Sequence, residues 1–109
     1  MARRALTPDM VELVAERFRV LAEPARLQIL QCLRDGELTV TDLVLATGLG
    51  QANVSKHLRQ LDASGFVSRR KDGLFSFYML ADRSVFQLCE IMCDRLEAEH
   101  RARAKVLTR

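Results

Sequence analysis

The spacing of hydrophobic residues predicts two helices at the start of the chain. Residues 8–21 repeat apolar side chains at intervals of three and four, the period of an amphipathic helix. Residues 24–35 show a similar period and end before Gly36, the residue type that most often terminates a helix. Each segment opens with a proline, which suits the first helical turn because that position needs no backbone N–H.

The next segment has the organisation of a helix-turn-helix. Thr39 and Asp42 have the spacing of a capping box, which predicts a short helix that ends at Gly48. After a short turn, a longer helix is expected from residue 51 to residue 64. Gly65, directly after it, can supply the left-handed C-terminal cap. Two helices joined by so short a turn are typical of a helix-turn-helix, here residues 39–64.

Beyond this segment the hydrophobic period changes from about 3.6 to 2, which is typical of β-strands. Strands are expected over residues 67–71 and 74–80, joined by Asp72-Gly73, a dipeptide favoured in tight hairpin turns. Helical spacing then returns over residues 84–105. The predicted fold is mainly α with a small β-hairpin, a winged helix-turn-helix of four helices, a wing at residues 67–80 and a last helix.

Length and composition indicate a single globular domain, residues 1–109. Of the 109 residues, 49% are hydrophobic and 28% are charged, a balance that is typical of folded rather than disordered chains. No apolar run approaches the roughly 18–20 residues that a membrane span needs. Three cysteines without close paired spacing favour a reducing compartment. We therefore expect a cytoplasmic protein that does not enter a membrane.

Positive charge is concentrated in the middle of the sequence. Residues 51–73 contain five Lys or Arg and two Asp or Glu, a net charge of +3. Residues 8–50 and residues 74–99 each carry a net charge of −3. A basic block between two acidic ones is typical of a surface that binds a polyanion such as nucleic acid.

One face of the helix predicted at residues 51–64 suits DNA. Val54, Leu58 and Leu61 lie within about 60° of one another around the helix and are expected to face the core. The remaining surface carries small, amide and basic side chains, which can approach the major groove, read base edges and bind phosphates. These candidate DNA contacts are Ala52, Asn53, Ser55, Lys56, Arg59 and Gln60.

The hairpin adds a second basic element directly after that helix. Arg69, Arg70 and Lys71 lie beside the expected turn at Gly73, at the tip of a two-stranded ribbon. A basic ribbon next to a helix-turn-helix can hold the phosphate backbone or enter the minor groove while the helix occupies the major groove. All three cations and Gly73 are therefore candidate DNA contacts.

Two segments carry a family resemblance. LAEPARLQIL, at residues 21–30, resembles the opening signature of the ArsR/SmtB repressors. QANVSKHL, at residues 51–58, is similar to the recognition helix of that family. The paired motifs are specific, and the resemblance extends over about residues 10–98, most of the chain.

The resemblance implies a homodimeric winged-helix repressor. Its first and last helices, here residues 8–21 and 84–105, would form the dimer interface. Such proteins leave an inverted-repeat operator in double-stranded DNA when a metal or a thiol-reactive signal binds. One difference is Gly50, where the family commonly has a serine that caps the recognition helix. The resemblance places in DNA-contacting positions Gln51, Ala52, Asn53, Ser55, Lys56 and His57, with the wing at residues 69–73.

The three cysteines are the candidate sensing residues. Cys89 and Cys93 are four residues apart on the last helix, so their Cβ atoms lie about 6 Å apart on one face. An unstrained disulfide needs about 3.8 Å, whereas two thiolates at the wider spacing can share a soft metal or metalloid ion. Relatives that sense persulfide place one cysteine on the second helix and one on the last, a pattern that Cys32 with Cys89 or Cys93 resembles.

Two sites known from relatives lack their residues here. The cysteine pair of the third helix is replaced by Thr39 and Thr41, and threonine is a poor ligand for soft metals. For a zinc site between the last helices, this sequence offers Glu97 and His100. It lacks the Asp and His that precede them in relatives. A soft ion at the cysteines is therefore the candidate ligand, and no cofactor follows directly from the sequence.

Two other functions stay open at this stage. A winged-helix regulator without an inducer would use its cysteines only for packing. A winged helix that serves only protein–protein contact would show no salt-dependent binding to DNA. An enzyme is not expected, because the sequence has no glycine-rich phosphate loop after a strand and no Ser/His/Asp set.

Overall fold

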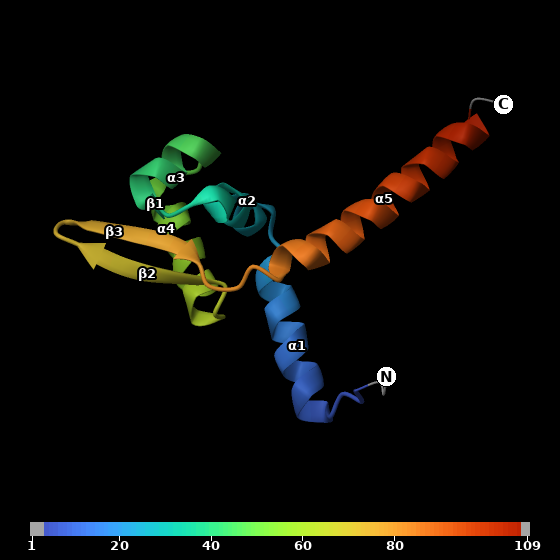
Figure 1. Ribbon diagram of the computed structural model, residues 1–109, viewed down its shortest axis with the longest axis horizontal. Helices are drawn as coiled ribbons and strands as arrows, with labels where there is room; N and C mark the ends of the chain where they lie inside the picture. The colour runs from blue at the N-terminus through green and yellow to red at the C-terminus, as the bar shows by residue number, and fades with distance from the viewer. Residues whose placement is uncertain (1–3, 108–109) are drawn as a thin grey trace.

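A computed structural model describes residues 4–107 of the chain, with side chains described as far as residue 103. The mainly helical fold with a small antiparallel sheet is the one that the sequence predicts (Figure 1). The elements are, in order, α1 (Pro8–Leu21), α2 (Pro24–Cys32), the 3₁₀ helix η1 (Leu33–Asp35), β1 (Leu38–Thr39), α3 (Val40–Thr47), α4 (Gln51–Ala63), β2 (Val67–Asp72), β3 (Phe75–Leu80) and α5 (Val85–Leu107).

The predicted helix caps of the helix-turn-helix are present. The hydroxyl of Thr39 accepts a hydrogen bond from the Asp42 backbone N–H at 3.1 Å, and the Asp42 carboxylate accepts one from the Thr39 N–H at 3.0 Å. This reciprocal pair is the capping box expected at the start of α3. Gly48 ends α3 with φ at 75°, a left-handed conformation that glycine adopts without steric cost. Both ends of α3 are thereby capped.

The sheet has three strands, whereas the sequence predicted two. β1 pairs antiparallel with β3, placing Leu38 opposite Tyr78 and Thr39 opposite Phe77, so the strand order is β1-β3-β2. A strand of two residues has no periodicity that a sequence pattern can reveal. This short strand joins the residues before α3 to the middle of β3.

The hairpin turn lies one residue later than predicted. Asp72 pairs with Phe75, so Gly73 and Leu74 form the connection, and the expectation of an Asp72-Gly73 turn is wrong. Gly73 has φ at 61°, and within the described residues no side-chain-bearing residue has positive φ. Glycine at the first central position is what a type II′ hairpin turn requires. Leu74 is consequently placed at the tip of the wing, fully exposed.

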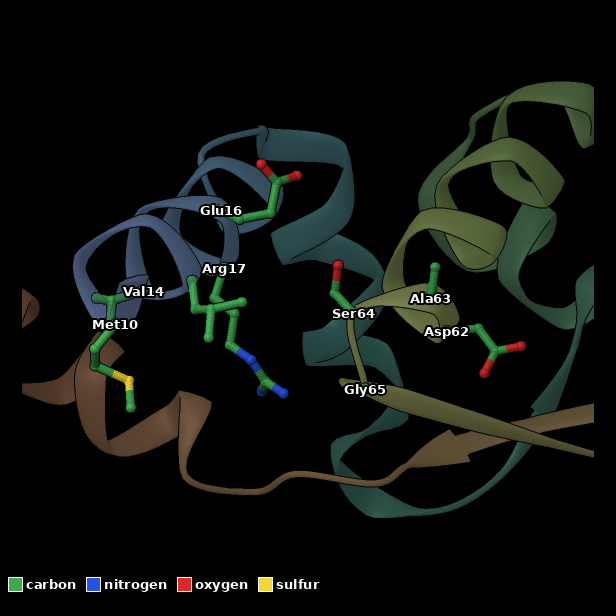
Figure 2. Close-up of a pocket in the computed structure, with 9 residues that line it drawn as sticks. Met10, Val14, Glu16, Arg17, Asp62, Ala63, Ser64 and Gly65 are labelled. Atoms are coloured by element: carbon green, nitrogen blue, oxygen red, sulfur yellow. The ribbon is translucent and has the colours of Figure 1, made fainter. Parts of the chain in front are cut away.

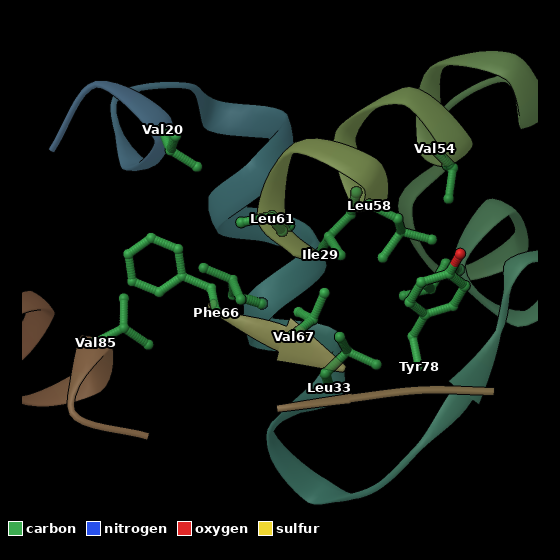
Figure 3. Packing of buried hydrophobic residues seen from close by; sticks show 12 residues of the cluster. Val20, Ile29, Leu33, Val54, Leu58, Leu61, Phe66, Val67, Tyr78 and Val85 are labelled. Carbon is green, nitrogen blue, oxygen red and sulfur yellow. The ribbon is translucent and has the colours of Figure 1, made fainter. Parts of the chain in front are cut away.

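The core is centred on α4, and Figure 3 shows its packing. Val54, Leu58 and Leu61 are fully buried, as the sequence predicts. Because these three residues face inward, the opposite side of α4 is held toward solvent. The other members of the buried cluster come from α1, α2, η1, α3, the connection before β2, the sheet and the start of α5, and are Val20, Ile29, Leu30, Leu33, Leu43, Phe66, Val67, Tyr78 and Val85.

The two terminal helices project from this core. α5 extends away from the body of the molecule, and α1 leaves it nearby in another direction (Figure 1). The radius of gyration is 17.3 Å, whereas a compact domain of this length has about 13 Å. Among the described residues, no helix is both long enough and apolar enough to cross a membrane. Within the described part of the chain, both projecting helices carry exposed apolar side chains, among them Leu13 and Phe18 on α1 and Met92 and Leu96 on α5.

Candidate nucleic-acid interface

The first half of α4 presents an exposed polar surface. Gly50 occupies the N-cap position and provides no side-chain hydrogen bond to the helix. The first backbone N–H groups of α4 are therefore available to an external acceptor, such as a phosphate oxygen. Ser55 is half-buried on this surface. The exposed candidate contacts of α4 are Gln51, Ala52, Asn53, Lys56, Arg59 and Gln60.

His57 occupies a different environment from these residues. It is half-buried, and its Nδ1 lies 3.1 Å from Nη1 of Arg26 on α2. The same Arg26 nitrogen donates to the Gln60 side-chain oxygen at 2.6 Å, and Arg26 Nε donates to the carbonyl of Val20. Arg26 therefore connects the end of α1 with α2 and α4. It holds the side of α4 that carries His57 against α2. A direct contact between His57 and DNA stays a prediction.

The three wing cations are divided between two faces of the sheet. In an antiparallel pair, residues directly opposite each other share a face, and neighbours along a strand alternate. Arg69 pairs with Tyr78 and Lys71 with Ser76, on the face that packs on the core. Arg70 pairs with Phe77, on the other face.

Arg70 is also held by other side chains of the same chain. Its Nε donates to Glu37 at 2.9 Å, and its Nη2 donates to the second oxygen of the same carboxylate. The guanidinium carbon lies 4.5 Å from the centroid of the Phe77 ring, and Nη1 lies 3.7 Å from an Asp72 oxygen. No local pattern predicts this pair, because 33 residues separate Glu37 from Arg70.

The cysteines lie on two elements. Cys32 is half-buried at the end of α2, packs against the core and lines a groove between α2 and α3. On α5, Cys89 is half-buried and Cys93 is exposed, and all three thiols are free. Within the part of the chain that the structure describes, no group of three or more His, Cys, Asp or Glu could hold a metal ion. The described residues of a single chain therefore supply too few ligands for such a site.

A groove of about 640 Å³ lies between α1 and the C-terminal end of α4 (Figure 2). Met10 and Val14 line it from α1, and Ser64 and Gly65 line it from the end of α4. It lies at the opposite end of α4 from Gln51, so it is not part of the polar surface described above. A smaller groove between α1 and the start of α5 continues the same apolar side of the molecule.

A helix-turn-helix whose second helix turns polar side chains to solvent, followed by a basic β-wing, defines the winged helix-turn-helix class. The sequence profile of the family described as "Bacterial regulatory protein, arsR family" matches residues 23–69. The relatives described below extend this match over most of the chain. The protein belongs to the ArsR family.

Two curated relatives and one solved structure illustrate this membership. The HTH-type transcriptional regulator KmtR of Mycobacterium tuberculosis is 41% identical over 83 residues, which are 76% of this chain and 64% of that protein. The transcriptional repressor SmtB homolog of Synechocystis is 36% identical over 89 residues, 82% of this chain and 67% of that protein. The chain thus spans about two thirds of the length of these relatives.

The solved structure is that of the homodimeric winged helix-turn-helix DNA-binding domain Mb0332 from Mycobacterium bovis. It is 31% identical, covers 92% of this chain and 95% of that domain, and superposes with a TM-score of 0.74. The family resemblance and the winged helix-turn-helix fold predicted from the sequence are confirmed. The family consists of DNA-binding regulators, which confirms the expectation that the protein is not an enzyme.

Proposed function

We propose that the protein is a homodimeric transcriptional repressor, which binds an inverted-repeat operator in double-stranded DNA in the cytoplasm. The observation that carries the proposal is the exposed first half of α4, where Gln51, Asn53 and Lys56 are exposed while Val54, Leu58 and Leu61 are buried. Amide side chains pair with base edges in the major groove, and lysine pairs with phosphates. The wing then lies beside the same duplex and adds cations to the backbone contacts.

The uncovered surface of the terminal helices supports a dimer. On α1, Leu13 and Phe18 are more than half exposed, and on α5 so are Met92 and Leu96. Apolar surface of this extent, continuous with the two grooves beside α1, is typical of a surface that another protein copy covers. A two-fold dimer also presents two recognition helices, which matches an inverted-repeat operator.

The test begins by selecting duplexes that the reduced protein retains from a random library. A titration followed by fluorescence anisotropy then compares the selected duplex with a scrambled one at several salt concentrations. We expect an inverted repeat with half-sites about 10 base pairs apart, and a preference of roughly a thousandfold or more over the scrambled duplex. Equal affinity for both duplexes, or the absence of binding, would contradict the proposal and favour a protein–protein module.

The signal that releases the repressor is proposed to act at the cysteines of α5. Cys89 and Cys93 lie along the side of α5 that carries Leu88, Met92 and Leu96, so the two thiols border the proposed dimer surface. A soft metal or metalloid ion held by both thiolates, or a persulfide formed on them, would change the packing of the two α5 helices. Such a ligand would favour a subunit orientation in which the recognition helices no longer fit successive major grooves.

Adding arsenite, cadmium or a persulfide donor to the operator complex tests this second proposal. At least one of the three is expected to release the DNA from the wild-type protein, as followed by anisotropy. The same addition should leave the Cys89→Ser/Cys93→Ser variant bound, and Cys32→Ser shows whether the α2 thiol takes part. Complexes that survive every addition would instead indicate that the cysteines only pack.

A further inference from the structure

We propose that Arg70 is a positioning residue, which braces the wing against Glu37, and that the DNA-facing cations of the wing are Arg69 and Lys71. This inference rests on the proposed DNA-binding function. It separates three neighbouring cations that the sequence alone treats as equivalent.

The ion pair of Arg70 and Glu37, called the brace below, crosses the full width of the sheet. Arg70 lies on the edge strand β2, and Glu37 directly precedes β1, the opposite edge strand. The Arg70 side chain passes over its cross-strand partner Phe77 on β3, with the guanidinium carbon 4.5 Å from the ring centroid, before it meets the carboxylate. The ion pair therefore joins the two outer strands over the central one.

This connection matters because, among the described strands, the outer part of the wing pairs with none beyond its own hairpin. β1 pairs with β3 at Tyr78 and Phe77, halfway along the hairpin. From Ser76 to the turn, β3 pairs with β2 alone. A two-stranded ribbon is by itself marginally stable, so its direction depends on contacts made where it leaves the three-stranded part of the sheet. Arg70 and Glu37 supply such a contact.

The chemistry of the pair suits a brace. Two parallel N–H···O bonds between guanidinium and carboxylate fix the relative orientation of the two groups, which a lysine ammonium does not. The hydrogen bonds from Arg70 hold the pKa of the Glu37 carboxyl below its ordinary value. A phosphate would have to displace this carboxylate before it could use the same donors.

The other two cations, Arg69 and Lys71, lie on the face of the ribbon opposite to Arg70. Arg69 and Lys71 alternate with Arg70 and project from the sheet face that also carries Tyr78, which packs against the helical core. A duplex that lies along the exposed side of α4 meets this face of the ribbon first, because α4 packs on the same side of the sheet. Arg69 and Lys71 are exposed there.

The test measures operator affinity and its salt dependence for single variants. Arg69→Ala and Lys71→Ala should each lower the slope of log affinity against log salt by about 0.9, the loss of one phosphate contact. Arg70→Ala should leave the slope unchanged and lower affinity by about two- to fivefold, the range of a partly exposed ion pair. Arg70→Lys, which keeps the charge but not the two-pronged geometry, should lose as much as Arg70→Ala.

Glu37→Gln gives the sharpest comparison. Removing an acidic charge near DNA should by itself strengthen binding to a polyanion, and the neighbouring exposed acid Asp35 supplies this control as Asp35→Asn. The brace predicts the opposite for Glu37→Gln, an affinity loss equal to that of Arg70→Ala and no further loss in the double variant. Without DNA, NMR order parameters of residues 71–76 should fall in Glu37→Gln and stay unchanged in Asp35→Asn.

Several outcomes would overturn the inference. A slope that falls by about 0.9 in Arg70→Ala and is restored in Arg70→Lys would make Arg70 a phosphate ligand. Tighter binding by Glu37→Gln would mean that Glu37 only masks Arg70, and unchanged order parameters would show that the pair does not hold the wing. Failure of the wild-type protein to bind any duplex would instead overturn the proposed function.

Discussion

The double variant Met92→Glu/Leu96→Glu is expected to be monomeric and to lose tight operator binding. Both side chains are about 60% exposed in a single chain, 62% for Met92 and 58% for Leu96, although they are apolar. In the proposed dimer they are buried, and an unpaired carboxylate at such a position is strongly unfavourable. Operator affinity should fall by about 100-fold or more, because a monomer meets only one half-site.

Sedimentation and anisotropy measure the two effects separately. The matched control is Gln87→Glu/Ala98→Glu, which adds two acids to the same helix at exposed positions away from the stripe of Met92 and Leu96. The control should remain dimeric and bind DNA nearly as tightly as the wild type. A Met92→Glu/Leu96→Glu protein that stays dimeric would show that α5 does not form the interface.

Replacing Asn53 with alanine is expected to have the second largest effect, and it should change specificity as well as affinity. Asn53 lies on the exposed first half of α4, where an amide side chain can form two hydrogen bonds with a base edge. Its removal should cost about 1–3 kcal/mol on the selected operator and relax the preference at one base pair of each half-site. Binding to the scrambled duplex should change little.

Lys56→Ala is the comparison for this prediction. Lys56 lies on the same exposed surface but carries a charge, so its loss should weaken binding to all duplexes alike and lower the salt slope by about 0.9. Repeating the library selection with each variant separates the two roles. An unchanged base preference for Asn53→Ala would remove this residue from the base contacts.

The sequence predicted the α-helices closely because their signals are local. The capping box of Thr39 and Asp42 and the buried stripe of Val54, Leu58 and Leu61 depend on residues within a few positions of one another. The same reasoning placed the exposed side of α4 correctly, since the direction of the stripe determines it. The candidate DNA contacts on α4 follow from that geometry.

The features that the sequence did not predict depend on residues far apart in the chain. β1 is a strand only because Leu38 and Thr39 meet β3. The contacts of Arg26 with His57 and of Arg70 with Glu37 join residues 31 and 33 positions apart. No local spacing records such pairs, so a charged residue in a basic cluster is indistinguishable from its neighbours until the register is known. Arg70 is the clearest example.

The central claim is that two copies of α4 lie in successive major grooves of one operator, and methylation interference tests it most directly. Dimethyl sulfate modifies guanine N7 in the major groove and adenine N3 in the minor groove, and the duplexes that the protein still binds are then separated from those it rejects. We predict two clusters of interfering guanine N7 positions, about 10 base pairs apart, one for each recognition helix. Tight binding that no guanine N7 methylation disturbs, or a single cluster, would contradict the account.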